Sequence, residues 1–353
     1  MRDYCYKKAW QKLLTPEIVT MLTQIHEYKG KQSLFYVAQK DVLDQLMDAA
    51  KIQSTESSNE IEGIYTSDHR LKLLVKDKTR PQNRNEEEIA GYRDVLNAIH
   101  VDYPHIPVKP SIILQLHRDL YKFEGYDIGG RYKTGDNIIE KIDEHGQVSV
   151  RFQSVASCKT AESVEKLCQA FEEAVVSENI DMLLLMPMFI LDFLCIHPFH
   201  DGNGRMSRLL TLLLLYRSDY MVGKYISIEK QIKITKASYY AAFQQSSQDW
   251  HENHNDYEPF TRYMLGVLLG AYREFSTRVE QLAIDGMSKS DRVRKVIQDT
   301  LGTITKAEIL AKCPNISQVT VQRALSDLIA ANMIRKIGGG RYTKYTWNRE
   351  NEK

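Results

Sequence analysis

The chain has 353 residues, with 47 Lys and Arg against 46 Asp and Glu, a formal net charge of +1 and 43% hydrophobic residues. This composition is typical of a soluble protein, and the net charge near zero indicates neither a nucleic-acid nor a membrane partner for the whole chain, so charge is read locally. The length exceeds what one hydrophobic core usually fills, so we expect two or three domains.

Cysteine usage and the apolar segments indicate a cytoplasmic protein. The five cysteines are scattered and include no CxxC pair, which argues against a disulfide or zinc scaffold. The first residues, MRDYCYKKAW, lack the apolar stretch of a signal peptide. The longest apolar run, residues 182–196, is interrupted by Pro187 and Asp192 and is too short to span a bilayer. We therefore expect a cytoplasmic protein with no membrane partner.

The N-terminal region has the apolar spacing of helices. Thr15-Pro16-Glu17 is typical of a helix start, and apolar residues follow at helical intervals. A second helix is expected over residues 42–50, after a turn around Lys29-Gly30-Lys31. Residues 54–63 predict a short connecting helix that serines open and Gly63 ends.

The middle of the chain combines more helices with one strand pair. Residues 66–83 are basic and polar, contain Pro81, and predict no regular element. Two β-rich runs, residues 137–142 and 147–152, flank a turn with Gly146 and predict a hairpin, which must pack on something because isolated hairpins are marginal in water. Helices are expected over residues 86–100, 112–121, 160–176, 182–196, 209–216, 239–243 and 260–275.

The C-terminal region differs in charge and pattern. Residues 291–349 contain eleven Lys and Arg against four Asp and Glu, a local balance of 11 − 4 = +7. A helix over 292–301, a capping box at Thr305 and Glu308, and a helix over 317–332 precede two strands. This order is that of a winged helix-turn-helix, with residues 317–332 as the recognition helix.

These observations give a mainly α chain of three parts. Residues 1–105 form an N-terminal helical region, residues 106–285 a core with the hairpin and the helices that follow it, and residues 286–353 a winged helix-turn-helix domain.

Residues 197–208, HPFHDGNGRMSR, place a polar loop between two apolar helices. Gly202 and Gly204 flank Asn203 and let the backbone turn so that its N–H groups point outward. These groups would lie at the start of the helix that begins near Arg205. A helix start of this kind binds anions through free N–H groups and the helix dipole.

The side chains of this loop supply the other parts of a phosphate site. Arg205 and Arg208 lie three residues apart, on one side of the helix, and both can fork onto phosphate oxygens. Asp201 is suited to Mg²⁺, which takes one or two carboxylates plus substrate phosphates. His197 can accept a proton from a hydroxyl at neutral pH. Together these groups predict transfer of a phosphate-containing group to an alcohol.

The histidines of the loop allow a second interpretation. His197 and His200 would supply half of a zinc site. No further ligands cluster nearby in the sequence, so the residues favour Mg²⁺ over zinc.

The loop resembles the signature of Fic-domain proteins, HPFx(D/E)GNGRxxR, at every specified position. The family's inhibitory motif, (S/T)xxxE(G/N), resembles residues 58–63, SNEIEG. Residues 130–133, GRYK, followed by a hairpin, are similar to the family's flap. The resemblance implies a Fic-type helical core with a β-hairpin flap, plus the C-terminal winged helix-turn-helix domain.

Most Fic enzymes transfer AMP from ATP to a Tyr, Ser or Thr hydroxyl of a target protein, and the resemblance implies this activity here. His197 would be the general base, and Asp201 would position Mg²⁺ on the α- and β-phosphates. Arg205 would steady the leaving pyrophosphate and Arg208 the γ-phosphate. The N–H groups after Asp201 and the Asn203 side chain would hold phosphate oxygens. The implied nucleotide-binding residues of the loop are Gly202, Asn203, Gly204, Arg205, Met206, Ser207 and Arg208.

The resemblance also implies roles outside the loop. Tyr239 and Tyr240 match an aromatic pair near the nucleotide, although core packing explains them equally well. Phe199 would anchor the loop on the core. The flap residues implied to cover the nucleotide and to align the target by main-chain pairing are Asn137, Ile138, Ile139 and Glu140.

Residues 58–63 imply autoinhibition. Glu62 would pair with Arg208 and remove it from the γ-phosphate, so that ATP binds unproductively. Ser58 would cap the helix that carries Glu62. In some relatives the same glutamate takes part in removing AMP from the modified target, and this reverse activity stays open here.

Other functions also stay open at this stage. Doc-type relatives transfer phosphate and carry Ala and Lys where Gly202 and Gly204 stand, so the glycines favour AMP transfer. A DNA-binding regulator with a nucleotide-sensing Fic domain is the second interpretation, motivated by the basic C-terminal region, which could instead dock a protein. A homodimer and self-modification are further alternatives.

Overall fold

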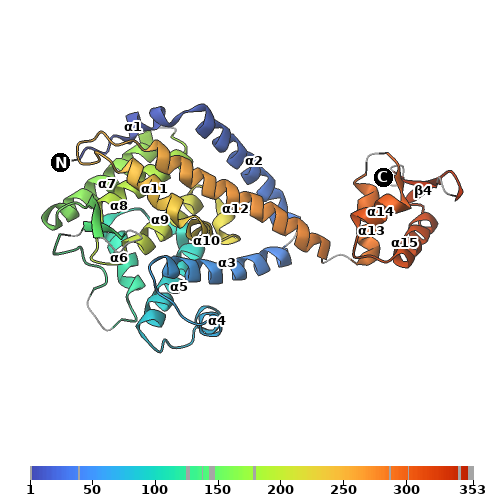
Figure 1. Ribbon diagram of the computed structural model, residues 1–353, viewed down its shortest axis with the longest axis horizontal. Helices are drawn as coiled ribbons and strands as arrows, with labels where there is room; N and C mark the ends of the chain where they lie inside the picture. Colours follow the sequence, from blue (N-terminus) through green and yellow to red (C-terminus); the bar gives the residue numbers. More distant parts are fainter. Residues whose placement is uncertain are drawn as a thin grey trace. The chain divides into compact units, whose positions relative to one another are not determined.

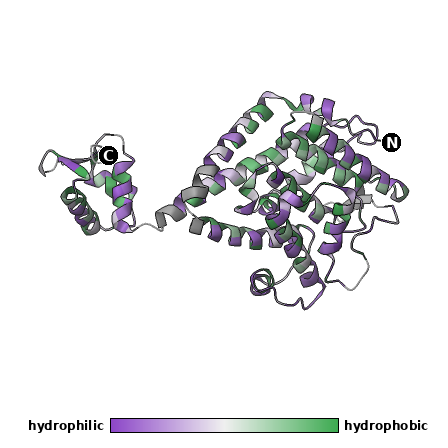
Figure 2. Cartoon of the chain, turned by 180° about the vertical axis from the view of Figure 1, so that it is seen from behind, coloured by the Kyte–Doolittle hydropathy of each residue, from purple (hydrophilic) through white to green (hydrophobic). Residues whose placement is uncertain are grey.

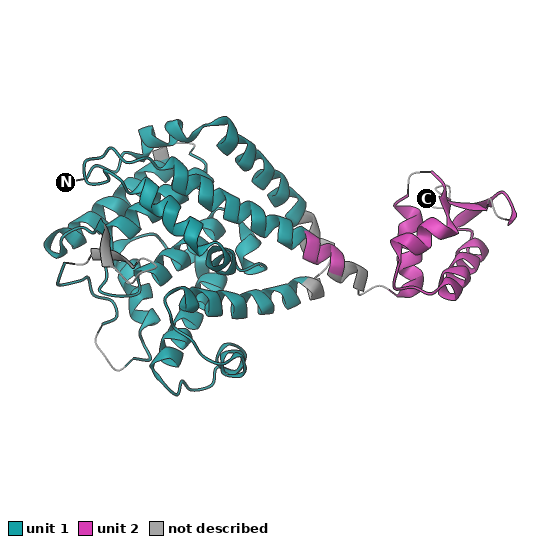
Figure 3. Cartoon of the chain, in the orientation of Figure 1, with its two compact units in different colours: residues 1–276 teal, residues 277–353 magenta. Residues whose placement is uncertain are grey.

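A computed structural model describes residues 2–38, 40–124, 128–136, 138–142, 148–177, 180–285, 288–300, 302–340 and 343–348. The chain divides into two compact units, Met1–Ser276 and Thr277–Lys353 (Figure 3). The boundary lies within helix α12, Glu258–Asp285, which belongs to both units.

The first unit is mainly helical (Figure 1). Short 3-10 helices occur at η1 Trp10–Leu13, η2 Tyr103–His105 and η3 Met221–Lys224. Besides α12, its α-helices are α1 Tyr6–Ala9, α2 Pro16–Ala38, α3 Lys40–Ile61, α4 Asp68–Lys76, α5 Arg84–Asp102, α6 Pro110–Leu120, α7 Ser157–Ser177, α8 Met182–Ile196, α9 Asn203–Arg217, α10 Ile228–Ile234 and α11 Lys236–Ser246.

Helices α8 and α9 form the centre of this unit. All residues of α8 from Leu183 to Ile196 are buried, as are those of α9 from Arg205 to Tyr216. Figure 2 shows hydrophobic residues gathered toward the interior of the unit. The prediction of a buried helix over 182–196 is confirmed. Within the described ranges, helices that could cross a membrane are absent.

The N-terminal helices are longer than the sequence predicted. The turn expected at Lys29-Gly30-Lys31 is wrong, because α2 continues through it to Ala38. One glycine costs a helix only about 1 kcal/mol, and the packing of α2 on its neighbours outweighs that cost. Ile18 and Ile25 are fully buried, and the Tyr28 ring stacks on Tyr272 of α12 with centroids 6.2 Å apart.

The short helix expected at residues 54–63 is also wrong. Residues 54–61 form the end of α3, which packs against α5 and α10. Ser54, Ser57 and Ser58 are buried in that packing, so tertiary contacts override the preference of serine for helix starts. Gly63, with φ +82°, follows the helix end as predicted. Helix α4 was missed, although Leu71, Leu74 and Val75 bury one face of it.

The predicted hairpin is present. Strands β1 Ile138–Ile142 and β2 Val148–Gln153 pair antiparallel, with Ile138 opposite Gln153 and Ile142 opposite Val148. The register shifts between Ile139 and Glu140.

The N-terminal region expected as a separate part, residues 1–105, belongs to the same unit as the core. Helices α3 and α5 both pack against α9. The functional loop between α8 and α9 therefore lies in one unit with the segment that carries Glu62.

The second unit has its own hydrophobic core. Its helices are α13 Lys289–Gln298, α14 Lys306–Lys312 and α15 Gln318–Ala330, and its strands β3 Ile304–Thr305, β4 Ile334–Ile337 and β5 Lys344–Trp347 pair antiparallel in the order β3-β5-β4. The Thr305–Glu308 capping box is present, as predicted. The core includes Val293, Ile297, Ile309, Val321, Leu325 and Ile334.

A buried polar cluster ties the N-terminus to α8. Asp192 is fully buried and lies 3.1 Å from the Arg2 guanidinium. Its carboxylate accepts hydrogen bonds from Tyr6 Oη at 2.7 Å and Trp250 Nε1 at 2.6 Å. Tyr257 Oη also donates to it at 2.9 Å. These partners come from both ends of the first unit, so the cluster holds α8 in place.

We predict that Asp192→Asn lowers the free energy of unfolding by about 3–5 kcal/mol, because it leaves the buried Arg2 charge uncompensated. The measurement is urea denaturation of the full chain. Glu17→Gln serves as the control, since Glu17 pairs with Arg262 at 3.4 Å and is 60% exposed. That control should change stability by less than about 1 kcal/mol. Equal small effects of the two substitutions would contradict the prediction.

Candidate active site

The loop between α8 and α9 makes two left-handed backbone turns. His197 ends α8 with φ +51°, and Gly202 precedes α9 with φ +81°. A non-glycine residue with positive φ is uncommon and concentrates at functional sites. Helix α9 begins at Asn203, so its first free N–H groups follow directly after Asp201.

The loop is braced from inside. Asn203 Oδ1 accepts from Phe199 N at 2.9 Å, and Asn203 Nδ2 donates to Phe199 O at 2.8 Å. This side chain therefore stabilises the loop, and its contact with phosphate stays a prediction. Phe199 is fully buried and stacks on the His117 ring with centroids 3.7 Å apart, which agrees with its predicted anchoring role.

His117 links the loop to the segment before the hairpin. Gly130 N donates to His117 Nδ1 at 3.0 Å, so the ring proton lies on Nε2, which is 3.1 Å from the Asp201 carbonyl oxygen. Burial lowers the pKa of His117 to about 4, which keeps the ring neutral.

His197 is the titratable group of the site. Burial, together with the nearby Lys133 ammonium, lowers the pKa of His197 to about 4. Lys133 Nζ donates to Ile196 O at 3.2 Å and to Ser154 Oγ at 2.7 Å, and its own pKa falls to about 8 through burial. The imidazole is therefore neutral at pH 7 and can accept a proton. Because Nδ1 is buried, Nε2 is the nitrogen that can reach a hydroxyl in the pocket.

Arg205 is buried between two helices. Its Nη1 lies 2.7 Å from Glu88 Oε2 of α5, and its Nη2 donates to Tyr121 Oη, just after α6, at 2.7 Å. Asp201 Oδ2 is 3.6 Å from the same Nη2, and its side chain is 54% exposed. Burial alone would raise the pKa of Asp201, but the Arg205 charge and hydrogen bonds from Gly202 N and Tyr121 lower it.

Arg208 contacts the end of α3. Its Nη2 lies 2.7 Å from Glu62 Oε1, forming the predicted ion pair. Arg208 Nε donates to Ser58 Oγ at 2.8 Å and Nη2 to Ser58 O at 2.8 Å. The prediction that Ser58 caps the helix is wrong, because Ser58 lies inside α3 and accepts from Arg208 instead.

Gly204 allows Glu62 to approach the start of α9. A Cβ at Gly204 would lie 2.2 Å from Glu62 Oε1, so this carboxylate rests directly on the helix backbone. The pocket beside it measures about 160 Å³, which is below the roughly 300 Å³ typical of ligand pockets. It is lined by Glu62, Leu194, His197, Gly204, Arg208, Tyr239, Tyr240 and Phe243.

The other residues predicted to bind the nucleotide differ in whether they line this pocket. Tyr239 and Tyr240 line the pocket with His197, whereas the Met206 and Ser207 side chains are buried and do not line it. Residues 138–140 form the start of β1, opposite Val150 to Gln153. Asn137 lies outside the described residues.

The sequence did not reveal four residues whose side chains contact Arg205, the loop or the end of α8. They are Glu88, His117, Tyr121 and Lys133. Glu88 is 4% exposed although it lies in a run of three glutamates that suggests a solvated helix start. Lys133 belongs to the segment recognised before the hairpin, but no pattern indicated its contacts with the end of α8. A buried charge is recognisable only once its partner from another element is known.

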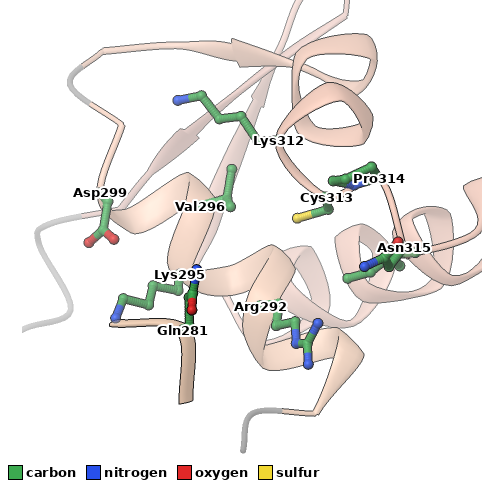
Figure 4. Close-up of a pocket in the computed structure, with 10 residues that line it drawn as sticks. Gln281, Arg292, Lys295, Val296, Asp299, Lys312, Cys313, Pro314 and Asn315 are labelled. Carbon is green, nitrogen blue, oxygen red and sulfur yellow. The ribbon is translucent and has the colours of Figure 1, made fainter. Parts of the chain in front are cut away.

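Another pocket lies in the second unit, between α13 and the loop after α14, with a volume of about 350 Å³ (Figure 4). Arg292, Lys295 and Lys312 line it, along with Cys313, whose pKa is raised by burial. No histidine is among the described residues that line it. Its volume exceeds that of the pocket at His197.

The residues of the loop fit a magnesium nucleotide. Mg²⁺ needs one or two carboxylates when phosphates supply other ligands, and Asp201 offers a half-exposed carboxylate at the start of α9. Among described side chains, groups of three or more His, Cys, Asp or Glu that could hold a metal alone are absent. A cation at Asp201 would therefore depend on ligands from a bound substrate.

Comparisons with known proteins agree with this geometry. Residues 107–215 match the Fic/DOC family. The fold is similar to a Fic family protein from Desulfovibrio desulfuricans G20, with TM-score 0.61 and 22% identity, covering 96% of this chain and 98% of that chain. A Fic domain containing signaling protein from Bacteroides thetaiotaomicron VPI-5482 gives TM-score 0.62 and 22% identity, covering 73% and 97%. Fic-1 from C. elegans gives 0.57 and 18%, covering 74% and 72%. The chain therefore contains a Fic/DOC family domain.

Proposed function

We propose that the protein is an adenylyltransferase that transfers AMP from ATP to a hydroxyl of a target protein, and that Glu62 holds it inactive. One observation carries this proposal. The Glu62 carboxylate occupies the anion position at the start of α9, on Gly204 and against Arg208. A carboxylate in that place mimics a phosphate group, which the same N–H groups and guanidinium would bind.

The nucleotide would lie along the start of α9. N–H groups of residues 202–204 would contact phosphate oxygens, and Tyr239 and Tyr240 would line the adjoining pocket. Arg208 would bind the γ-phosphate after Glu62 leaves. Arg205 is buried against Glu88 and Tyr121, and from this position its positive charge would stabilise the leaving pyrophosphate.

The target hydroxyl would approach His197. His197 Nε2 takes the hydroxyl proton while the hydroxyl oxygen forms a bond to the α-phosphorus. The bond from that phosphorus to the bridging oxygen of pyrophosphate breaks, and pyrophosphate leaves with the electron pair. Mg²⁺ bound at Asp201 would neutralise charge on the phosphates. The β1 backbone would align the target segment by strand pairing.

The position of Glu62 supports the proposed autoinhibition. Arg208 is buried, so it requires an anionic partner at all times. Without nucleotide that partner is Glu62, and the γ-phosphate would have to displace it. The contacts of Arg208 with Ser58 do not involve this carboxylate, so Arg208 would keep its position after the exchange.

A second candidate function is DNA binding by the second unit. Helix α15 exposes Gln318, Gln322 and Arg323, and β4 exposes Arg335 and Lys336. Exposed cations on a helix and on an adjoining hairpin favour contact with phosphate backbones. This activity is compatible with AMP transfer by the first unit.

We predict that Glu62→Gly raises AMP transfer at least about tenfold over wild type, because Arg208 becomes available to ATP. His197→Ala in that background should lower labelling by about 100-fold or more. The measurement uses full-length protein, Mg²⁺ and α-labelled ATP, followed by mass spectrometry of the labelled proteins. Glu56→Gly, within α3 and six residues before Glu62, is the control and should label as weakly as wild type.

Labelling with γ-labelled ATP separates AMP transfer from phosphate transfer. AMP transfer leaves label on the target only when the α-phosphate carries it. Equal labelling by wild type and Glu62→Gly would sink the autoinhibition proposal, and label from the γ-phosphate would replace AMP transfer by phosphate transfer.

The low pKa of His197 predicts a flat pH profile near neutrality. The neutral, proton-accepting form persists as pH falls until the folded pKa of about 4 is approached. Initial rates of Glu62→Gly should therefore change less than about twofold between pH 7 and pH 5, below the Lys133 pKa of about 8, at saturating Mg²⁺ and ATP. An acid limb with an apparent pKa near 6.5 would be the contrary result.

Residues 286–353 should bind duplex DNA at low salt, with affinity that falls as salt rises. This fragment contains the whole core of the second unit. A gel-shift titration compares it with the double variant Arg335→Gln and Lys336→Gln, which should bind more weakly, and with Lys289→Gln at the start of α13 as a control. Failure of the fragment to bind at low salt would reject the second candidate.

A further inference from the structure

Arg205 and Asp201 carry opposite charges, but the distance between them is longer than that of a close ion pair. Arg205 Nη2 and Asp201 Oδ2 are 3.6 Å apart, four residues apart along one helix start. The guanidinium instead makes closer contacts of 2.7 Å with Glu88 and 2.7 Å with Tyr121. Arg205 is 1% exposed, whereas the Asp201 side chain is 54% exposed.

Tyr121 contacts three parts of the site at once. Its hydroxyl accepts from Arg205 and also helps to lower the pKa of the Asp201 carboxyl. Its ring lies 5.2 Å from the Arg205 guanidinium carbon. The ring also supports the loop, since a Cβ at Gly202 would lie 2.9 Å from Tyr121 Oη. Tyr121 is 2% exposed, so packing fixes this hydroxyl.

Glu88 supplies the charge that holds Arg205 inward. Its side chain is 5% exposed, and Arg84 Nε lies 3.3 Å from the Oε1 that Arg205 does not contact. The carboxylate is thus fixed between a surface arginine and a buried one. Removing its charge would leave Asp201 as the nearest anion for Arg205.

We propose that Tyr121 and Glu88 are positioning residues that keep Arg205 from pairing with Asp201, which leaves the Asp201 carboxylate turned outward for a divalent cation. A carboxylate paired with a guanidinium offers fewer lone pairs and less negative charge to Mg²⁺, and residues that orient a metal ligand typically change metal affinity by about 10–100-fold when replaced. This inference rests on the proposed function in that the cation arrives with ATP.

The experiment measures how much Mg²⁺ strengthens nucleotide binding. Isothermal titration of full-length Glu62→Gly with α,β-methylene ATP gives Kd with and without Mg²⁺, and the ratio of the two is the magnesium gain. Asp201→Asn in that background sets the lowest gain. The test variants are Tyr121→Phe, which keeps the ring, and Glu88→Gln, which keeps the shape of the side chain. Tyr103→Phe is the control for loss of a tyrosine hydroxyl outside the site.

Tyr121→Phe and Glu88→Gln should each lower the magnesium gain about tenfold, toward that of Asp201→Asn, with little change in Kd without Mg²⁺. Glu88→Asp should recover part of the gain because it restores the charge. Tyr103→Phe should keep the full gain.

A full gain in both test variants would overturn the proposal. An equal loss of affinity with and without Mg²⁺ would also overturn it, since that is the result of a general distortion. If Glu62→Gly transfers no AMP while the gain still depends on Tyr121 and Glu88, the adenylyltransferase proposal fails and the positioning role stands.

Discussion

The contact between the Glu62 carboxylate and Arg208 at the start of α9 is the interaction on which the site depends. Arg208 lies in the core with 3% exposure, where a charge without a partner would cost several kcal/mol. Glu62, the residue directly after α3, supplies the partner from 146 residues earlier in the chain. The same position suits a phosphate, so the nucleotide and the glutamate would compete for one arginine and one set of N–H groups.

The apolar helices on either side of the loop fix the backbone that both anions would contact. Helices α8 and α9 are buried along almost their whole length, so the loop between them has fixed ends. Asn203 and His117 brace the loop from inside, and Lys133 N donates to Pro198 O at 2.9 Å. With the backbone held at these points, exchange of anions would require movement of Glu62 rather than of the loop.

The turn and the helix start within residues 197–208 were predictable because their parts are consecutive, whereas the chemistry of the loop stays a prediction. Residues 197–208 fix a turn and a helix start by local rules, and Glu62 was found because a contiguous motif carries it. The course of α2 through Gly30 and the inclusion of Ser58 in α3 were not predictable from local preferences, since tertiary packing decided them. Glu88 and Tyr121 acquire their roles only from partners on other helices. The predicted flap hairpin is confirmed as the pair of strands β1 and β2. The contact of Asn137 with the nucleotide stays a prediction.

Crystal structures of wild type and Glu62→Gly with α,β-methylene ATP and Mg²⁺ would test the central claim most directly, by locating the γ-phosphate relative to Arg208. The account predicts a γ-phosphate bound to Arg208 in Glu62→Gly, and in wild type an intact pair of Glu62 with Arg208 and a γ-phosphate elsewhere. A γ-phosphate on Arg208 in wild type, with Glu62 still in its present place, would contradict it.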